Sequence, residues 1–445
     1  MHRSTYLSHP VVQSFIEWLS ANLDNSTFKH AYLNRLRKTP WQCESLSHAF
    51  EQYHWAHPAI SRLNVKPGAT AHSNHIALMA LKADLHNALA PGQAHDGAAC
   101  QASIDVMVWG GVQAKNVSWL NTHREGLAAR LSAVRDALDA GDTDAALLTD
   151  ASLRFNAGMT KVYSLICRDF VIYDSRVAAA LGWAVVMYCR AHQLSKVPVE
   201  LAFPWAAAKE AGARPAKRRN PGEGALRFPR LKASTNHAQW NLKASWMLTA
   251  VLKHPNAALS GFNASTKGDI AALRKLEAAL FMIGYDLGPG ADGETLPVEP
   301  ADPEADWNGC FTASHRNPFR YRLTPKGLRV EKGPVFALEM INAMLTDLHQ
   351  GFGSSPFPLL NSRDDVPNGV SAEGIGTAYY RATGQRGQPI HASKLAAILE
   401  DLGVFSLVQG SKRWMLNVDL LTTGANGTLD IKPLIERALN DEEPG

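Results

Sequence analysis

Two ionisable side chains, a lysine amine and an aspartate carboxylate, carry the strongest chemical signal in this 445-residue sequence. Lys161 follows Gly-Met-Thr at the start of an expected short helix. Asp174 occupies the N-cap position of the next expected helix, residues 175–190. A carboxylate can stabilise a cationic sugar centre or orient water, and a desolvated lysine can attack a sugar carbon to form a Schiff base. Both steps serve in cleavage of N-glycosidic bonds.

The same two residues also have ordinary structural roles. An aspartate at a helix start is commonly only a cap, and a lysine on a short helix is commonly solvated. In the second helix, Val177, Leu181, Val185 and Tyr188 fall on one face, which predicts a core face with Asp174 at its rim. The helical arrangement therefore brings the amine and the carboxylate to one corner.

Hydrophobic periodicity predicts that the rest of the first 285 residues is mostly helical. Trp109-Gly110-Gly111 indicates a turn, either a helix connection or part of a ligand pocket. The expected helices cover residues 11–23, 75–89, 125–140, 234–253 and 267–282. We expect these helices to form one unit that presents the corner.

Gly158-Met159-Thr160-Lys161-Val162, followed after a short helix by Val171-Ile172-Tyr173-Asp174-Ser175-Arg176-Val177, resembles the core of the helix-hairpin-helix DNA glycosylases. The 8-oxoguanine glycosylase branch of that family has Gly-x-Gly-x-Lys and then Val-Asp-x-His-Val. Bacterial proteins with an 8-oxoguanine-glycosylase fold are similar too. The resemblance covers roughly residues 100–255. It implies that Asp174 is the catalytic aspartate and Lys161 the Schiff-base lysine.

The chain departs from the family pattern at two points. The second hairpin glycine is missing, and Lys161 precedes Asp174 by 13 residues, a shorter interval than in the family. The resemblance therefore supports Asp174 more firmly than Lys161. If Lys161 is structural or holds a phosphate, the enzyme is monofunctional and has no lyase activity. The four-cysteine pattern of the endonuclease III branch is absent, so no iron-sulfur cluster is expected.

A basic segment follows the corner. Residues 209–232 hold eight Lys or Arg against two Glu, interleaved with Pro and Gly, which predicts a loop along a phosphate backbone or a solvated insertion. Trp109 and Trp240 are candidates to stack on or wedge beside a flipped base, with core packing as the alternative. The expected DNA contacts are Arg176, Arg214, Lys217, Arg218, Arg219, Arg227, Arg230 and Lys232.

The charge distribution supports a polyanionic partner. Residues 1–285 carry 31 basic and 20 acidic groups, a net of +11, whereas the whole chain has +4. Neutralised phosphates release counterions, so a basic unit favours nucleic acid. The five widely spaced cysteines predict reduced, mostly buried thiols, and the histidines match no zinc signature. We expect no metal or cofactor, no membrane segment and a cytoplasmic location.

The C-terminal third differs from the rest. Residues 286–305 are acidic and rich in Pro and Gly, which predicts a linker between a unit of residues 1–285 and one of residues 306–445. In the latter, we expect helices at 335–348 and 393–402 and a hairpin of 404–408 with 413–416. This outline is that of a winged helix.

The sequence thus predicts a mostly α DNA glycosylase with an appended winged-helix-like α+β domain. Its partner would be double-stranded DNA containing a damaged or modified base, in base-excision repair or in anti-phage defence, for example against glucosylated hydroxymethylcytosine. The alternative is a non-catalytic DNA-binding protein that retains the glycosylase scaffold.

Overall fold

The computed structural model describes residues 1–34, 39–90, 92, 95–150, 152–208, 217–232, 234–263, 270–288, 307–312, 318–331, 333–385, 387–408, 411–424 and 426–441. About half of the chain is helical, and the strands form small antiparallel sheets, so the mostly α prediction is confirmed. The predicted linker falls largely at residues 289–306, outside the described residues.

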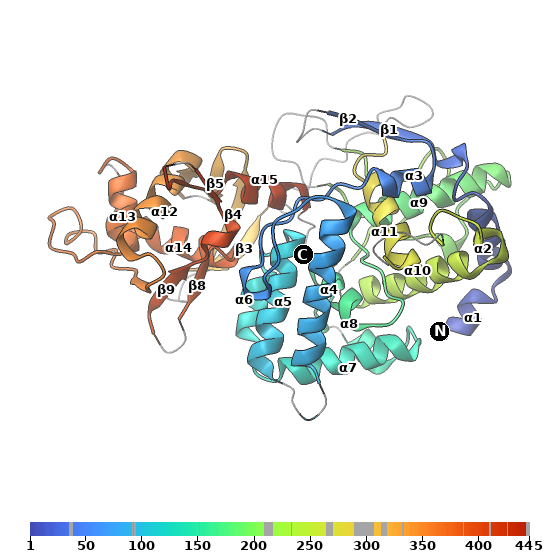
Figure 1. The fold of residues 1–445 in the computed structure, drawn as a ribbon, viewed down its shortest axis with the longest axis horizontal. Helices are drawn as coiled ribbons and strands as arrows, with labels where there is room; N and C mark the ends of the chain where they lie inside the picture. Colours follow the sequence, from blue (N-terminus) through green and yellow to red (C-terminus); the bar gives the residue numbers. More distant parts are fainter. Residues whose placement is uncertain are drawn as a thin grey trace.

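The described part of the chain has two hydrophobic cores. The larger is built from residues between Tyr6 and Leu287, and the smaller from residues between Tyr321 and Ala438. In Figure 1 the C-terminal elements lie beside α5 and α6, on the opposite side from α1 and α2. The two units therefore meet along the helices that precede the corner.

The N-terminal unit is a helical assembly with one β-hairpin, formed by β1 (His30–Asn34) and β2 (Thr39–Cys43). Glycines end two of its helices with positive φ angles, Gly111 after α5 at 69° and Gly141 after α7 at 74°. The helices are α1 (Arg3–Leu7), α2 (Pro10–Ala21), α3 (Leu46–Glu51), α4 (Ala71–Ala88), α5 (Asp96–Gly110), α6 (Asn116–Thr122), α7 (Leu127–Ala140), α8 (Ala157–Ile166), α9 (Ser175–Ala191), α10 (Thr235–Lys253) and α11 (Ala272–Ile283).

The helices around the corner are almost entirely apolar on their inner sides. In α9, every residue from Ser175 to Gly182 is buried, so this helix lies within the core instead of along its edge. α9 packs against α2 and α11, and α8 packs against α4, α5 and α7. Burial of such surfaces, worth about 25 cal/mol per Å², holds the corner rigidly inside the unit.

The C-terminal unit combines a four-stranded sheet, ordered β3-β4-β5-β6, with helices and a second sheet ordered β7-β9-β8. The expected hairpin is present, because β8 and β9 pair antiparallel. The elements are β3 (Asn308–Phe311), β4 (Pro318–Thr324), β5 (Gly327–Val330), β6 (Val335–Ala337), α12 (Leu338–Phe352), β7 (Phe357–Pro358), α13 (Ile375–Ala382), α14 (Ala392–Asp401), β8 (Phe405–Leu407), β9 (Arg413–Leu416), β10 (Thr422–Thr423), β11 (Leu429–Asp430) and α15 (Lys432–Asp441).

Several boundaries differ from the sequence prediction. α5 begins at Asp96, within a stretch for which no helix was expected, and the helix expected from residue 335 begins at Leu338, because residues 335–337 pair with β5. The hairpin of β1 and β2, the helix α13 and the split of residues 319–330 into β4 and β5 were also missed.

Candidate functional site

The corner expected from the sequence is present. Asn156 caps α8, its Oδ1 accepting the Met159 amide at 2.9 Å. Asp174 caps α9, its Oδ1 accepting the Arg176 and Val177 amides, both at 3.0 Å. These caps fix where each helix begins, and therefore where Lys161 and Asp174 lie.

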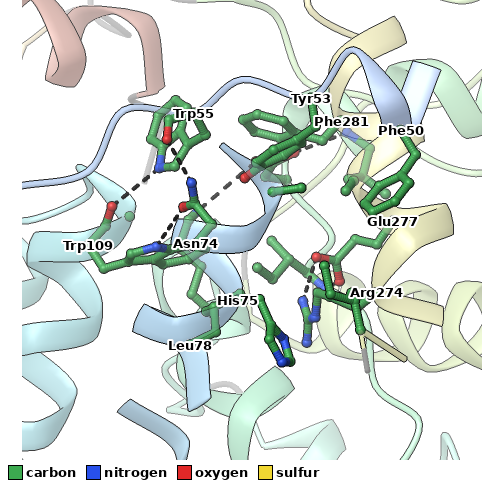
Figure 2. Close-up of a pocket in the computed structure, with 18 residues that line it drawn as sticks. Phe50, Tyr53, Trp55, Asn74, His75, Leu78, Trp109, Arg274, Glu277 and Phe281 are labelled. Atoms are coloured by element: carbon green, nitrogen blue, oxygen red, sulfur yellow. Dashed lines mark hydrogen bonds and ion pairs between the residues drawn. The ribbon is translucent and has the colours of Figure 1, made fainter. Parts of the chain in front are cut away.

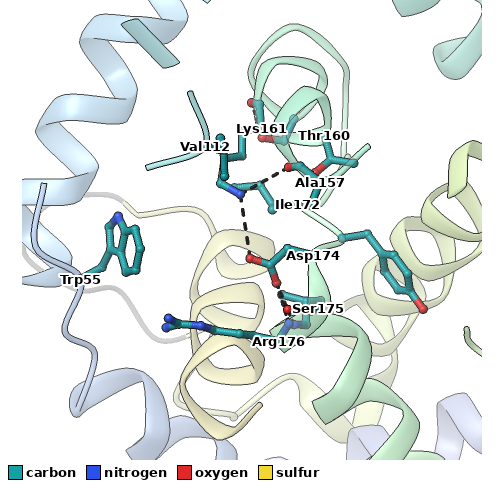
Figure 3. A network of polar contacts seen from close by, with 12 residues as sticks. Trp55, Val112, Ala157, Thr160, Lys161, Ile172, Asp174, Ser175 and Arg176 are labelled. Carbon is teal, nitrogen blue, oxygen red and sulfur yellow. Dashed lines mark hydrogen bonds and ion pairs between the residues drawn. The ribbon is translucent and has the colours of Figure 1, made fainter. Parts of the chain in front are cut away.

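Lys161 and Asp174 face each other at the corner (Figure 3). Lys161 Nζ lies 3.9 Å from Asp174 Oδ2 and donates a hydrogen bond to the Ala157 carbonyl at 3.3 Å. The two residues are only 6% and 8% exposed. A Cβ on Gly110 would lie 2.5 Å from Lys161 Cδ, so the glycine makes room for the lysine side chain. The pair is thus a buried ion pair with one carboxylate oxygen on the cap and the other toward the amine.

α10 holds the backbone that leads to Asp174. Ser245 Oγ accepts the Val171 amide at 3.1 Å, and Asn241 Nδ2 donates to the Val171 carbonyl at 2.8 Å. His237 Nε2 lies 2.7 Å from the Tyr173 carbonyl, and burial lowers the pKa of His237 to about 4, so the ring is neutral at pH 7 and donates this bond. The segment before Asp174 therefore has little freedom to move.

α11 contributes a second charged pair at the same place. Glu277 Oε2 accepts the Ile172 amide at 2.6 Å, and Glu277 Oε1 contacts Arg274 Nη1. Burial raises the pKa of Glu277 above its ordinary value, while Arg274 and the hydrogen bond from Ile172 oppose that shift. Glu277 and Arg274 thereby fix the peptide two residues before Asp174.

A pocket opens beside these charges (Figure 2). Its empty space is about 670 Å³, part of which is open to solvent. Flat rings dominate its walls, as a planar aromatic ligand requires. The lining residues are Phe50, Tyr53, Trp55, Ala71, Asn74, His75, Leu78, Trp109, Gly110, Lys161, Ile172, Asp174, Val177, Ile270, Arg274, Glu277, Ala278 and Phe281.

One wall of the pocket is locked by hydrogen bonds among Asn74, Trp55 and Trp109 (Figure 2). Trp109 Nε1 donates to Asn74 Oδ1 at 3.0 Å, and Asn74 Nδ2 donates to the Trp55 carbonyl at 2.8 Å. Trp55 Nε1 donates in turn to the Trp109 carbonyl at 3.3 Å. Trp109 therefore lines the pocket and is also packed in the hydrophobic core, so its position fits both interpretations of its sequence position.

Trp240 lies elsewhere. It packs edge-on against Phe203, with the ring centroids 5.4 Å apart, and Lys243 Nζ lies 4.4 Å from its ring centroid. Trp240 does not line the pocket. A role beside the base is thus not open to it in this conformation, and core packing accounts for its position.

Arg176 was expected to contact DNA, but its side chain points into aromatic rings. Its guanidinium lies 4.3 Å from the Phe281 ring centroid, 5.1 Å from that of Tyr285 and 5.3 Å from that of Trp55. It is 6% exposed. A phosphate contact is not open to Arg176 here; instead it supports the rings of the pocket wall.

Two of the first residues described in the basic segment, Lys217 and Arg219, are packed into the interior. Arg219 is 2% exposed, its Nε donates to the Tyr285 carbonyl at 3.1 Å, and its Nη1 contacts Ser175 Oγ. Lys217 is buried with Nζ 4.3 Å from the Tyr285 ring centroid. The expectation that these two cations face phosphates is therefore wrong for this conformation.

Arg218 is half-buried, and its guanidinium donates to Glu223 Oε1 at 2.7 Å and to the Asn220 carbonyl at 3.1 Å. Arg214 lies outside the described residues. By contrast, Arg227, Arg230 and Lys232 are exposed. Only these three of the predicted contacts keep a surface position in the described part of the chain.

Sequence reasoning missed the residues that complete the site. Glu277, Arg274, Asn74 and Phe281 reach the corner from helices about 100 residues away in sequence, and no local pattern marks that approach. One signal was available. Glu277 falls within the apolar stripe of α11, and because charged residues are seldom fully buried without a partner, its position indicates a polar contact in the interior.

Among the described residues, no cluster of His, Cys, Asp or Glu has the arrangement of a metal site. The cysteines are free thiols, four of them buried, which confirms the expectation for their state. None of the helices described is both long and apolar enough to cross a bilayer.

The chain was compared with known proteins at three levels. No family model matches it, no curated protein matches it, and no solved structure matches it.

Proposed function

We propose that the chain is a DNA glycosylase that takes a damaged or modified base out of duplex DNA and cleaves its N-glycosidic bond. One observation carries the proposal: a buried lysine-aspartate pair lines a pocket walled by aromatic rings. An extruded base needs flat apolar walls, and its sugar needs a carboxylate at C1′. Both features occur side by side here.

Asp174 would stabilise the transition state. Its Oδ1 is engaged by two amides of α9, whereas Oδ2 lies toward Lys161, and the residue lines the pocket. As the base leaves with the bonding electrons, positive charge develops at C1′, and a fixed carboxylate stabilises that charge in a site of low dielectric. The cap and the catalytic role are therefore compatible, because each uses a different oxygen.

Two versions of the reaction are open to experiment. In the monofunctional version, Asp174 orients a water molecule that adds to C1′ and leaves an abasic site. In the lyase version, the Lys161 ammonium first gives its proton to water, the amine attacks C1′ as the base departs with the bonding electrons, and a Schiff base forms after ring opening. The rigid backbone of residues 171–173 serves both, because it keeps the carboxylate in place.

Binding of the duplex would use cations at the surface of the N-terminal unit, including Arg227, Arg230 and Lys232. The C-terminal order α12–β7–α13–α14–β8–β9, with the sheet order β7-β9-β8, has the outline of a winged helix. We interpret this unit as winged-helix-like. Base-excision repair and anti-phage defence are both open as the setting.

The competing function is a non-catalytic DNA-binding protein. The capping bonds of Asp174 favour it, since they alone would explain an aspartate at this position. In that case Lys161 and Asp174 would be a structural ion pair and the pocket would bind no base.

A single assay separates these functions. The protein is incubated with ordinary, oxidised, deaminated and glucosyl-hydroxymethylated duplexes, and abasic sites are detected by alkali cleavage. We expect base release from at least one modified duplex and release that is roughly 10³-fold slower with the Asp174→Asn protein. No release from any duplex, together with retained DNA binding, would support the non-catalytic alternative.

Borohydride trapping distinguishes the two chemical versions. A covalent protein–DNA adduct that disappears in Lys161→Ala indicates the lyase version. Base release without an adduct indicates the monofunctional version. A parallel measurement of thermal unfolding for Lys161→Ala shows whether loss of the amine has acted through stability instead.

A further inference from the structure

The C-terminal unit contacts the turn that directly follows one wall of the pocket. This turn, residues 111–115, joins α5 to α6 and directly follows Trp109 and Gly110, both of which line the pocket. The C-terminal unit contacts Lys115 at the end of the turn and Val108 in the helix before it, and Ala114 within the turn packs against the C-terminal core. The two units thus share this segment.

Asp401, the last residue of α14, makes the central contact. Its Oδ1 accepts the Lys115 amide at 2.9 Å, and its Oδ2 accepts the Tyr321 hydroxyl at 2.6 Å. Asp401 is 4% exposed. Burial of a carboxylate without such donors costs free energy, because the charge loses its hydration. The Lys115 amide and the Tyr321 hydroxyl therefore stabilise Asp401 in its buried position.

Lys115 has the backbone conformation expected of a segment held from outside. Its φ is 60°, in the left-handed region that a residue with a side chain seldom adopts. Strained residues of this kind persist only where the surroundings hold them. The Asp401 carboxylate supplies one such restraint.

A second restraint lies three residues before the turn. Arg437 on α15 donates from Nη2 to the Val108 carbonyl, in the last turn of α5. Gln113, between the two restraints, is 2% exposed, and a Cβ at residue 403 in place of the Gly403 hydrogen would lie 3.6 Å from its Cγ. The backbone at Gly403 therefore approaches the turn closely, and the two units are in direct contact here.

The held turn connects to the corner through Asn116. Asn116 Oδ1 accepts bonds from Asn156 Nδ2 at 3.0 Å and from Arg154 Nη2 at 3.1 Å. Its Nδ2 occupies the space beside Gly158, where a Cβ would come within 2.1 Å. Asn156 is the cap of α8, so the path runs from Asp401 to the helix that carries Lys161.

We propose that Asp401 is a positioning residue for the pocket: through Lys115 and Asn116 it fixes the turn after Trp109 and the start of α8. The C-terminal unit then forms part of the pocket's support, and a ligand bound to one unit is coupled to the other. The role in activity rests on the glycosylase proposal, whereas the coupling itself does not.

The test is amide hydrogen exchange of the full chain without DNA. In Asp401→Ala, the Lys115 amide loses its acceptor, and we expect exchange in peptides covering residues 108–117 to be about tenfold faster. Tyr321→Phe removes only the hydroxyl and gives a smaller change in the same peptides. Asp401→Asn keeps an oxygen for the Lys115 amide and restores most of the protection.

Asn342→Ala is the matched control. Asn342 is half-buried in the C-terminal unit, where it bonds Asp430 and the Ile431 amide away from the turn. The substitution weakens that unit just before α15 but leaves the Asp401 carboxylate in place, so exchange at residues 108–117 changes much less than in Asp401→Ala. If Asp401→Ala changes these peptides no more than Asn342→Ala does, the proposal is wrong. Should Asp401→Ala fail to fold, Tyr321→Phe carries the same test.

Base release gives the second readout. If the parent is active, we expect Asp401→Ala to lower the single-turnover rate about tenfold while the affinity for unmodified duplex is unchanged. An inactive parent with the expected exchange pattern would contradict the glycosylase proposal and leave the coupling standing. An active parent with unchanged exchange and unchanged rate in Asp401→Ala would contradict the coupling alone.

Discussion

Two groups of buried charges in the N-terminal unit have different surroundings. At the corner, Lys161 and Asp174 border a pocket that opens to solvent. In the segment of residues 217–219, Arg219 and Lys217 are enclosed by the Tyr285 carbonyl, the Tyr285 ring and Ser175. Both groups are less than one tenth exposed.

The contrast shows that burial alone does not mark a functional charge. Arg219 directs its donors to groups that also need partners, so it stabilises the approach of residues 217–219 to α9. Asp174 uses Oδ1 in the same structural way, but its Oδ2 lies toward Lys161 and the residue lines a pocket. A charge that borders empty space can act on a ligand, whereas an enclosed charge can act only on the fold.

The largest expected effect comes from substitution of Asp174. Asparagine is as good an N-cap as aspartate, so Asp174→Asn keeps α9 and removes the charge, whereas Asp174→Ala removes both. We expect base release to fall by roughly 10³-fold in both proteins. Both lose the partner of the buried Lys161 amine, and Asp174→Ala should be about 1 kcal/mol less stable than Asp174→Asn because it also lacks the cap. Single-turnover kinetics and urea unfolding measure the two effects. Equal activity of Asp174→Asn and the parent would show that the corner is structural, as at Arg219.

Arg219→Ala tests the other side of the comparison. The substitution leaves the Tyr285 carbonyl and Ser175 Oγ without their buried donor, and we expect a loss of about 3 kcal/mol in unfolding free energy. Arg227→Ala is the control, because Arg227 belongs to the same basic segment of residues 209–232 but is exposed. It should change stability by less than about 0.5 kcal/mol. Equal effects of the two substitutions would mean that the enclosure of Arg219 contributes nothing.

Acid should loosen the corner through His237. Burial lowers its pKa from the ordinary 6.5 to about 4, so between these values the unfolded chain binds a proton that the folded one does not. Stability therefore falls as the pH falls through this range, by about 2 kcal/mol from pH 7 to pH 5. Glu277, whose pKa is raised, acts in the opposite direction. The measurement compares the pH dependence of urea unfolding in the parent and in His237→Gln. Both proteins contain Glu277, so its contribution cancels in the difference. In the variant, the unfolding free energy should not fall by this amount between pH 7 and pH 5. An equal pH dependence in both proteins would contradict the assignment to His237.

The sequence predicted the corner because its signals are local. A capping residue and an apolar stripe depend on neighbours within a few positions, and these were enough to place Asp174 before Ser175 and Lys161 on the preceding helix. The helix-and-hairpin outline of the C-terminal unit follows from similar signals, and the structure has α12, α14 and the β8-β9 pair near the expected positions.

The remainder depended on contacts distant in sequence. Composition shows that residues 217–219 are positively charged but does not show whether they face solvent or the interior. Their orientation is set by contacts with Tyr285 and Asp286, which follow α11. In the same way, the buried Glu277 and the grip of Asp401 on Lys115 arise only when separate helices meet. The count of charges led to the prediction that these cations lie at the surface, because cations are usually exposed. Here the tertiary contacts overrode that tendency.

The smallest effect is expected from the exposed cations of the same segment. Arg227, Arg230 and Lys232 lie at the surface, with Arg230 4.2 Å above the Trp205 ring centroid. If all three neutralise phosphates, their joint replacement by alanine lowers the slope of log affinity against log salt by about 3 and weakens binding uniformly across sequences. Fluorescence anisotropy of a labelled duplex at several salt concentrations measures this slope. Since each side chain is exposed, stability should be unchanged, and an unaltered slope would confine the phosphate contacts to other parts of the molecule. In that case neither the exposed nor the enclosed cations of residues 217–232 would contribute to DNA binding. The two groups would differ only in that the enclosed cations stabilise the fold.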